Sequence, residues 1–352
     1  MLLQLSLPLS PKFFSVLSVC SAVKRFRMTI DTLFIAGFGG PIKGCCKKFD
    51  PCPGEAYCFV SGIYGHNPAR KARIDEVAAH YKELGGFSKF NEITEAQGKA
   101  VIAELARRGI NLKLVCGYFY WNPYIVDQVA VMAKAGSKEF MALVMTPQQS
   151  AISWDGYLRR IQEGLEALPG DKPQLKAVVD PFFDKPGLIE AWADHARKAA
   201  EKLGYVGAKS GAPFPEDMGV IFSVHAVPQA LVGTSPYVKQ AEATAKLVAE
   251  KIQASHWKIG YQSQSSDSKI NWTEPSLENA IAALVKSGAK KIIGVPIGFL
   301  CDNVEVLYDL GIEGKHEAEK QGAKFAAAQA VNTHPAFIKM LADGVEAKLK
   351  LA

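Results

Sequence analysis

Apolar runs typical of strands alternate with amphipathic stretches typical of helices from Ile30 to the end of the chain. This alternation predicts a parallel α/β fold, because parallel neighbouring strands need a crossover connection that is usually a helix. The expected strands are Thr32–Ala36, Lys113–Gly117, Phe140–Met145, Leu175–Val179, Gly219–Val224, Lys258–Gln262 and Lys291–Pro296. The clearest expected helices are Thr94–Gly109, Gly187–Gly204, Pro236–Ile252, Pro275–Gly288 and His334–Leu349.

The chain is long enough for two domains. It has 352 residues, of which 48% are hydrophobic, and typical domains hold ~100–200 residues. The alternation runs through two similar passes, before and after about Leu175. We place the boundary in the loop Pro169–Pro173, which gives domains at 28–172 and 173–330. Residues 331–352 are predicted to form a C-terminal helix that packs back on the N-terminal domain.

Residues 1–27 differ from the rest of the chain because they are rich in Leu, Ser and Phe and contain no acidic residue. Their positive charges gather at the end of the segment, whereas a secretory signal begins with them. A basic, acid-free segment also suits an organelle transit sequence, but Met28 stands directly before the first expected strand. We therefore interpret 1–27 as a disordered extension or a start assigned too early, in preference to a targeting segment.

Composition excludes several classes of protein. The 41 Lys and Arg against 35 Asp and Glu are too nearly balanced to indicate nucleic-acid binding. No apolar run reaches the roughly 18 residues that a transmembrane helix needs. Seven cysteines in a long chain of ordinary core composition argue against a secreted disulfide scaffold. We expect a reducing compartment, the cytoplasm.

The stretch Gly219–Pro228 carries the strongest candidate for chemistry. Its apolar run predicts a buried strand that delivers His225 to the carboxyl edge of a sheet, where open α/β folds bind their ligands. A single histidine on an apolar run is more often a hydrogen-bonded core residue. The position at the strand end favours a functional role, because an imidazole can accept a proton or ligate a metal near neutral pH.

A row of acids follows the last expected strand. Three residues lie at intervals of four, Glu305, Asp309 and Glu313. On a helix this spacing makes one acidic stripe. A solvated helix surface is the ordinary interpretation, but Val306 and Leu310 are too apolar for a fully exposed helix. The functional interpretation is a path that leads hydrated divalent cations inward.

Two glycine- and cysteine-rich stretches near the N-terminus are less specific. Gly37–Pro41 reads GFGGP, which lacks the GxGxxG spacing of dinucleotide-binding folds. The loop after it holds four thiols, Cys45, Cys46, Cys52 and Cys58. Four thiolates can hold zinc or an iron–sulfur cluster, yet the spacing is not the paired CxxC pattern. A metal or redox site and unliganded thiols both remain open here.

With these residues in view, the chain from about Asp31 to Leu349 resembles the ferrochelatases, the class II chelatases of haem synthesis, which insert ferrous iron into a porphyrin. The matching stretches are in the family's order: Gly37–Pro41, Tyr81–Gln97, Gly117–Ile125, Phe222–Pro228, Ser235–Val248, Tyr261–Ile281 and Pro296–Glu313. The resemblance implies two Rossmann-like domains, each a parallel sheet flanked by helices, with the active site in the cleft between them.

The resemblance also implies roles for individual residues. His225 and Glu305 are expected to be catalytic, on opposite sides of the macrocycle. The expected metal ligands are His225, Glu305, Asp309 and Glu313. The expected porphyrin-binding residues are Phe38, Tyr118, Tyr120, Ser223, Tyr261, Gln264, Trp272 and Asn303. Porphyrin and ferrous iron are then the partners, no further cofactor is required, and a peripheral membrane contact is compatible with the poor solubility of protoporphyrin.

Three departures from the family pattern bear on substrate and metal. Asn303 stands where the family often has histidine, and Gln264 stands where it usually has arginine. Phe38 replaces the tyrosine of many enzymes that metallate coproporphyrin, which favours protoporphyrin IX. The C-terminus lacks the cysteines that bind an iron–sulfur cluster in some members, so we expect none.

The leading hypothesis is therefore insertion of Fe²⁺ into protoporphyrin IX. Coproporphyrin III is the alternative substrate, which Lys43, Lys47 and Lys48 keep open. Insertion of another divalent metal, such as cobalt, is supported only by Asn303 and Gln264. A non-catalytic porphyrin- or haem-binding protein ranks last, because such a protein is expected to lose His225 or Glu305 first.

Overall fold

The computed structural model describes residues 29–44, 52–207, 211–265 and 270–352. The predicted extension 1–27 lies outside the described residues, and so do Cys45 and Cys46 of the predicted thiol cluster. Within the described chain, no helix combines the length and the apolar character that crossing a bilayer demands.

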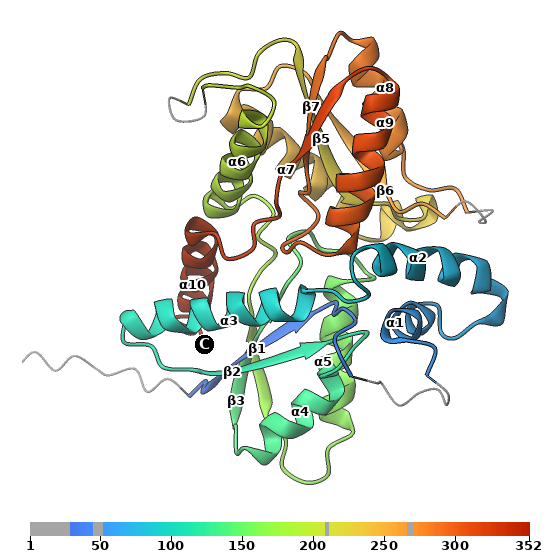
Figure 1. The fold of residues 1–352 in the computed structure, drawn as a ribbon. Helices are drawn as coiled ribbons and strands as arrows, with labels where there is room; N and C mark the ends of the chain where they lie inside the picture. Colours follow the sequence, from blue (N-terminus) through green and yellow to red (C-terminus); the bar gives the residue numbers. More distant parts are fainter. Residues whose placement is uncertain (1–28, 45–51, 208–210, 266–269) are drawn as a thin grey trace, which may run out of the picture.

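Two sheets of four parallel strands organise the molecule (Figure 1). The first contains β1 (Thr32–Gly37), β2 (Lys113–Tyr118), β3 (Glu139–Val144) and β4 (Gln174–Val178), in the order β2-β1-β3-β4. The second contains β5 (Met218–His225), β6 (Trp257–Gln262), β7 (Lys291–Val295) and β8 (Lys324–Ala327), in the order β6-β5-β7-β8. The orders are identical, so the two passes seen in the sequence fold into two units of one topology. The predicted pair of Rossmann-like domains is confirmed.

The shared order determines where ligands can bind. In each sheet the first strand lies between the second and the third, so the crossovers leave it in opposite directions. A crevice at such a switch point, beyond the carboxyl ends of the strands, is the usual ligand site of open α/β sheets. The carboxyl end of β1 leads to Phe38, and the carboxyl end of β5 is His225.

All seven predicted strands form within one residue of their expected bounds. β8 was not predicted; it is a short edge strand of four residues that begins with Lys324 and ends in two alanines. Such a segment lacks the β-branched apolar run by which buried strands are identified. A strand was therefore predictable where it formed a long apolar run, whatever its position in the sheet.

The predicted domain boundary at 172/173 is corrected by the structure. β4 follows that loop and pairs with β3, with Phe140 opposite Leu175 and Ala142 opposite Val178. It therefore completes the first sheet, and the chain passes to the second unit only after Val178. The loop Pro169–Pro173 is an ordinary connection between a helix and a strand, and its proline and glycine content does not distinguish it from a linker.

Helices cover both faces of each sheet. Around the first sheet lie α3 (Phe90–Arg107), α4 (Ile125–Lys134) and α5 (Trp154–Glu166). Around the second lie α6 (Pro186–Glu201), α7 (Tyr237–Ile252), α8 (Leu277–Lys286), the π-helix η3 (Glu305–Glu313) and α9 (Gly314–Lys320). Two short 3₁₀ helices are η1 (Pro68–Arg70) and η2 (Gln229–Thr234). β1 is buried on both sides, as expected for a central parallel strand.

Three further helices lie at the level where the two units meet (Figure 1). α1 (Glu55–Ile63) and α2 (Lys71–Glu83) pack on each other on one side of the molecule. α10 (Pro335–Leu349) packs against both α3 and α6 on the other side. In addition, the buried amide of Gln97 on α3 donates to the carbonyl oxygens of Leu300 and Asn332, both at 2.8 Å. The two units are thus joined by helix packing and by a buried polar contact.

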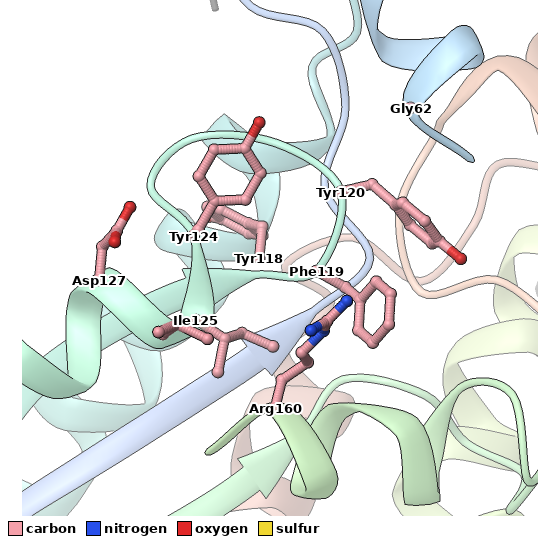
Figure 2. Close-up of a pocket in the computed structure, with 9 residues that line it drawn as sticks. Gly62, Tyr118, Phe119, Tyr120, Tyr124, Ile125, Asp127 and Arg160 are labelled. Carbon is pink, nitrogen blue, oxygen red and sulfur yellow. The ribbon is translucent and has the colours of Figure 1, made fainter. Parts of the chain in front are cut away.

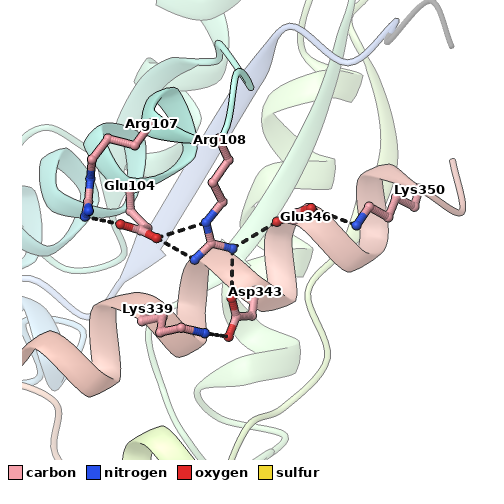
Figure 3. A network of polar contacts seen from close by, with 7 residues as sticks. All are labelled: Glu104, Arg107, Arg108, Lys339, Asp343, Glu346 and Lys350. Atoms are coloured by element: carbon pink, nitrogen blue, oxygen red, sulfur yellow. Dashed lines mark hydrogen bonds and ion pairs between the residues drawn. The ribbon is translucent and has the colours of Figure 1, made fainter. Parts of the chain in front are cut away.

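An ion-pair network fastens α10 to the end of α3 (Figure 3). The Arg108 guanidinium contacts Glu104 on its own helix at 2.6 Å, and Asp343 and Glu346 on α10 at 2.8 and 2.9 Å. One planar guanidinium thus bridges three carboxylates. Arg108 thereby connects the end of α3 to α10 through two ion pairs (Figure 3).

We expect Arg108→Ala to lower the free energy of unfolding by on the order of 1 kcal/mol, because the partly exposed pairs are screened by solvent. Denaturant unfolding at low and high salt measures the loss, which should shrink as salt rises. Arg107→Ala is the matched control, since that side chain is 77% exposed and pairs with Glu104 within α3. An equal loss for both variants would show that the contact to α10 contributes nothing.

Candidate active site

His225 lies at the point where a fully buried strand reaches solvent. Residues 218–224 of β5 are buried, and His225 is exposed. Its neighbour in the register is Gln262, the last residue of β6. Past this point the chain continues through Ala226, whose N–H still donates to the Gln262 carbonyl, and then Pro228, which has no N–H to continue the ladder. The local sequence therefore ends the strand at the histidine.

The hydrogen bond of His225 determines which ring nitrogen is available. Nδ1 lies 2.7 Å from the carbonyl oxygen of Ala226. A carbonyl can only accept, so Nδ1 carries the hydrogen and Nε2 holds the free lone pair. The residue touches solvent, yet protein surrounds the ring closely enough that desolvation lowers its pKa, with a smaller contribution from Arg73. A neutral imidazole with a free Nε2 can accept a proton or bind a metal.

The predicted acidic stripe forms on a π-helix, a wider turn than the α-helix that its spacing suggests. The N–H of Gly314 donates to the carbonyl of Asp309, five residues earlier. Asn303 begins this helix, because its Oδ1 accepts the N–H of Val306 at 3.1 Å. Asn303 is buried and holds this cap, and its contact with porphyrin stays a prediction. Short π-helical segments occur frequently at functional sites.

The three acids differ in their exposure to solvent. Glu313 is exposed, Glu305 is half-buried and Asp309 is 8% exposed. Desolvation raises the pKa of Glu305 to about 7, with a further contribution from the charge of Asp309. Desolvation also raises the pKa of Asp309 to about 6, and that of Glu313 to about 7. Near neutral pH these carboxyls are therefore poised to exchange protons.

These acids do not form a closed metal cage. Among the residues that the structure describes, no group of three or more His, Cys, Asp or Glu side chains is close enough to hold one ion. The predicted metal ligands His225, Glu305, Asp309 and Glu313 are therefore spread along the site. Their role as metal ligands stays a prediction.

Polar residues at the end of β6 hold the buried acid in place. Ser263 donates to Asp309 Oδ2 at 2.5 Å. The Gln262 amide donates to the Glu305 carbonyl at 2.7 Å and approaches Asp309 Oδ2 at 3.4 Å. Ser223 in turn donates to Gln262 Oε1. Ser223 is fully buried and orients Gln262, and its contact with porphyrin stays a prediction.

Helix α2 contributes two residues that the sequence analysis missed. The His80 ring stacks on Tyr308, with centroids 3.9 Å apart, and its Nδ1 lies 3.9 Å from Asp309 Oδ1. The positive charge of Arg73 lowers the pKa of Asp309 and of Glu313. His80 and Arg73 are seven residues apart and share one face of α2. This spacing places both residues on one helix face. The neighbouring sequence does not indicate that this face meets acidic residues more than 200 positions later.

Aromatic residues gather beyond the end of β1. Phe38 is half-buried and its ring centroid lies 4.8 Å from Tyr120, 6.1 Å from Phe59 and 6.5 Å from Phe90. Tyr120 is half-buried and, with Phe119, lines a cavity of about 330 Å³. Figure 2 shows the side chain of Arg160 reaching into this cavity from α5, and its guanidinium lies 4.8 Å from the Phe119 ring.

Two predicted porphyrin contacts belong to the core. Tyr118 has no exposed surface, and its hydroxyl donates to the Asn91 carbonyl at 3.0 Å. Tyr261 is 4% exposed and packs in the core cluster that contains Tyr237 of α7. Side chains alternate along a strand, so Tyr261 points away from the face on which Gln262 meets Glu305. The contact of either residue with porphyrin stays a prediction.

The remaining predicted contacts, Gln264 and Trp272, lie on the segment beside His225. The Gln264 amide donates to the Thr273 carbonyl at 3.0 Å, and Trp272 pairs with Pro228 in an isolated bridge. Both are half-buried. Their contact with porphyrin stays a prediction.

The GFGGP turn serves close packing. A Cβ on Gly40 would lie 2.7 Å from the Ser88 Cβ, and the Gly40 N–H donates to Asn91 Oδ1 at 3.0 Å. Gly39 has φ +95°, which favours glycine. The turn therefore packs against Ser88 and Asn91, next to Phe38. Both segments belong to the stretches that resemble the ferrochelatases.

The chain is similar to known proteins in fold and in sequence. The structure of SirB from Bacillus subtilis with Fe³⁺ superimposes with a TM-score of 0.51 at 12% identity, covering 91% of this chain and 96% of that one, which shows a shared fold. The ferrochelatase of Deinococcus radiodurans is 32% identical, over 91% of this chain and 96% of its own length. The coproporphyrin III ferrochelatase of Mycolicibacterium smegmatis is 28% identical, over 92% and 91%.

The model of the ferrochelatase family matches residues 66–349, which include β5 with His225 and the whole acidic π-helix. The family match, the sheet topology and the sequence relatives lead to the same conclusion. The chain belongs to the ferrochelatase family, the metal-chelating enzymes of haem synthesis.

Proposed function

We propose that this ferrochelatase inserts Fe²⁺ into protoporphyrin IX, yielding protohaem and two protons, with His225 and Glu305 as its catalytic residues. The observation that carries the proposal is the link between these two residues. Gln262 is the register neighbour of His225, and its amide donates to the Glu305 carbonyl at 2.7 Å. A base and a carboxylate are therefore held at one sheet edge by a single intervening residue.

The chemistry of insertion needs both groups. Fe²⁺ must lose bound water, and two pyrrole N–H groups must lose their protons. Carboxylates and imidazole are suitable ligands for Fe²⁺. The exposed Glu313 would receive the hydrated ion, and Asp309 and Glu305 would take it inward in exchange for water. His225 Nε2 would accept a proton from the porphyrin, since its pKa lies below the ordinary value and the ring is neutral.

The surroundings of Phe38 support protoporphyrin as the substrate. Protoporphyrin carries two propionates and two vinyl groups, whereas coproporphyrin III carries four propionates. The Phe38 ring packs near the aromatic rings of Phe59, Phe90 and Tyr120. Such surroundings favour an apolar substituent over a carboxylate, because an unpaired charge loses its hydration there. Relatives bear the names of both activities, so the substrate is the finer part of this proposal.

We expect anaerobic Fe²⁺ insertion to proceed with a kcat/KM at least about tenfold higher for protoporphyrin IX than for coproporphyrin III, about 1.4 kcal/mol of discrimination. Phe38→Tyr should reduce this ratio, because a hydroxyl offers a propionate a hydrogen bond. Phe87→Tyr, at an exposed phenylalanine before α3, is the matched control. Equal or reversed preference would overturn the substrate, and no turnover of either porphyrin would overturn the catalytic proposal.

A further inference from the structure

Two cysteines at the start of α1 lie in van der Waals contact. The Sγ atoms of Cys52 and Cys58 are 3.8 Å apart, and the two residues are six positions apart in the sequence. Cys58 sits in the second turn of α1, and Cys52 lies just before Gly54, the residue that begins the helix. A disulfide requires the sulfurs to approach to about 2.05 Å. The two sulfurs would have to move closer by less than about 2 Å to bond, and Cys52 is exposed, so little packing opposes its movement.

The two thiols differ in accessibility in a way that orders a reaction. Cys52 is exposed, and Cys58 is buried with 1% of its surface accessible. Cys116 and Cys301, the other two cysteines of the described residues, are half-buried and buried, and burial raises the pKa of Cys116 to about 12. An oxidant from solvent therefore meets Cys52 first, because thiol oxidation follows exposure and thiolate character.

We propose that Cys52 and Cys58 form a reversible dithiol–disulfide site that responds to peroxides. The Cys52 thiolate attacks hydrogen peroxide, forming a sulfenic acid and releasing hydroxide. The Cys58 thiol then attacks the Cys52 sulfur, forming the disulfide and releasing water. Both thiols together lose two electrons and two protons, and one peroxide is reduced to two water molecules. A dithiol reductant reverses the step by thiol–disulfide exchange.

The site borders the machinery for iron insertion. The Phe59 ring, next to Cys58, lies 5.7 Å from Tyr81 and 5.9 Å from Trp121. Tyr81 is on α2, the helix that also carries His80 (Figure 1). A disulfide would tie the segment before α1 to the buried side of this helix pair. The proposal rests on the thiol geometry and does not depend on the proposed porphyrin substrate.

The test uses the full chain, reduced and then exposed to a slight excess of hydrogen peroxide. Remaining thiols are alkylated, and the chain is cleaved after Glu55, between the two cysteines. We expect the loss of two alkylatable thiols per chain and two peptides joined through Cys52 and Cys58, lighter by two hydrogens. Dithiothreitol should restore both thiols. Cys58→Ser should leave a trappable sulfenic acid on Cys52, and Cys52→Ser should leave Cys58 reduced.

Cys116→Ser is the matched control, because that half-buried thiol lies on β2 and should not change the yield of the joined peptides. Full alkylation of Cys52 and Cys58 after peroxide would overturn the proposal. A disulfide that instead joins either residue to Cys45 or Cys46 would overturn it as well. Because Cys52 is exposed, Cys52→Ser tests the proposal even if Cys58→Ser folds poorly.

Discussion

His225→Ala is expected to reduce the rate of Fe²⁺ insertion by about 10²–10⁴-fold, the usual contribution of a positioned acid–base group. The variant removes the free Nε2 lone pair at the end of β5, and no other imidazole is on that strand. The initial rate of metalloporphyrin formation under anaerobic conditions measures the effect. Porphyrin binding should remain, because the histidine acts on the inner nitrogens rather than on the substituents of the ring.

Two controls separate catalysis from folding for this variant. His316→Ala removes an exposed histidine from α9 and should leave the rate unchanged. Added imidazole should restore part of the activity of His225→Ala if a proton acceptor is what is missing. The proposed role is wrong if His225→Ala retains the full rate, or if it loses porphyrin binding as steeply as turnover.

Glu305→Gln is expected to lower the rate by a similar factor and to alter its pH dependence. The pKa of Glu305 is raised to about 7 and that of Asp309 to about 6. Protonated carboxyls cannot take Fe²⁺ from water, so the rate of the unaltered enzyme should rise with pH between about 6 and 8. The two acids interact, so the profile reports apparent pKa values of the pair. In Glu305→Gln, the part of this increase near pH 7 should disappear, because the carboxyl with a pKa of about 7 is absent.

The contribution of Glu305 to the free energy of unfolding should fall as pH rises, whereas the rate of insertion should rise. A carboxyl whose pKa is higher in the folded than in the unfolded chain binds its proton more tightly when folded. Its contribution to stability is therefore complete below the unfolded value, near 4.5, and is lost as pH rises through about 7. Glu305→Gln lacks this charge, so it should be more stable than the unaltered chain at pH 8 and comparable at pH 4.

Glu319→Gln is the matched control for both measurements, because Glu319 is exposed on α9 and pairs with Lys315 of the same helix at 3.7 Å. It should change neither profile. A Glu305→Gln enzyme that keeps both the rate and the pH profile would remove Glu305 from the mechanism.

Local patterns predicted seven of the strands, the organisation into two units and the sheet edge at which His225 lies. Seven of the β-strands are apolar runs, and the end of such a run predicts a sheet edge, which is why the position of His225 at the end of β5 was predicted without a structure. The stripe Glu305 to Glu313 was recognised because residues four apart share a helix face. Periodicity and strand ends are properties of a few consecutive residues, so a sequence displays them directly.

Tertiary structure alone decided which residues line the site. Tyr118, Ser223, Tyr261 and Asn303 stand in family-like stretches, yet packing directs each into the core or into a cap. His80 meets Asp309 only because α2 lies against the π-helix. Such contacts join residues far apart in the chain, and the direction of a side chain depends on which neighbours exclude it from solvent. Neither property is contained in the local sequence pattern.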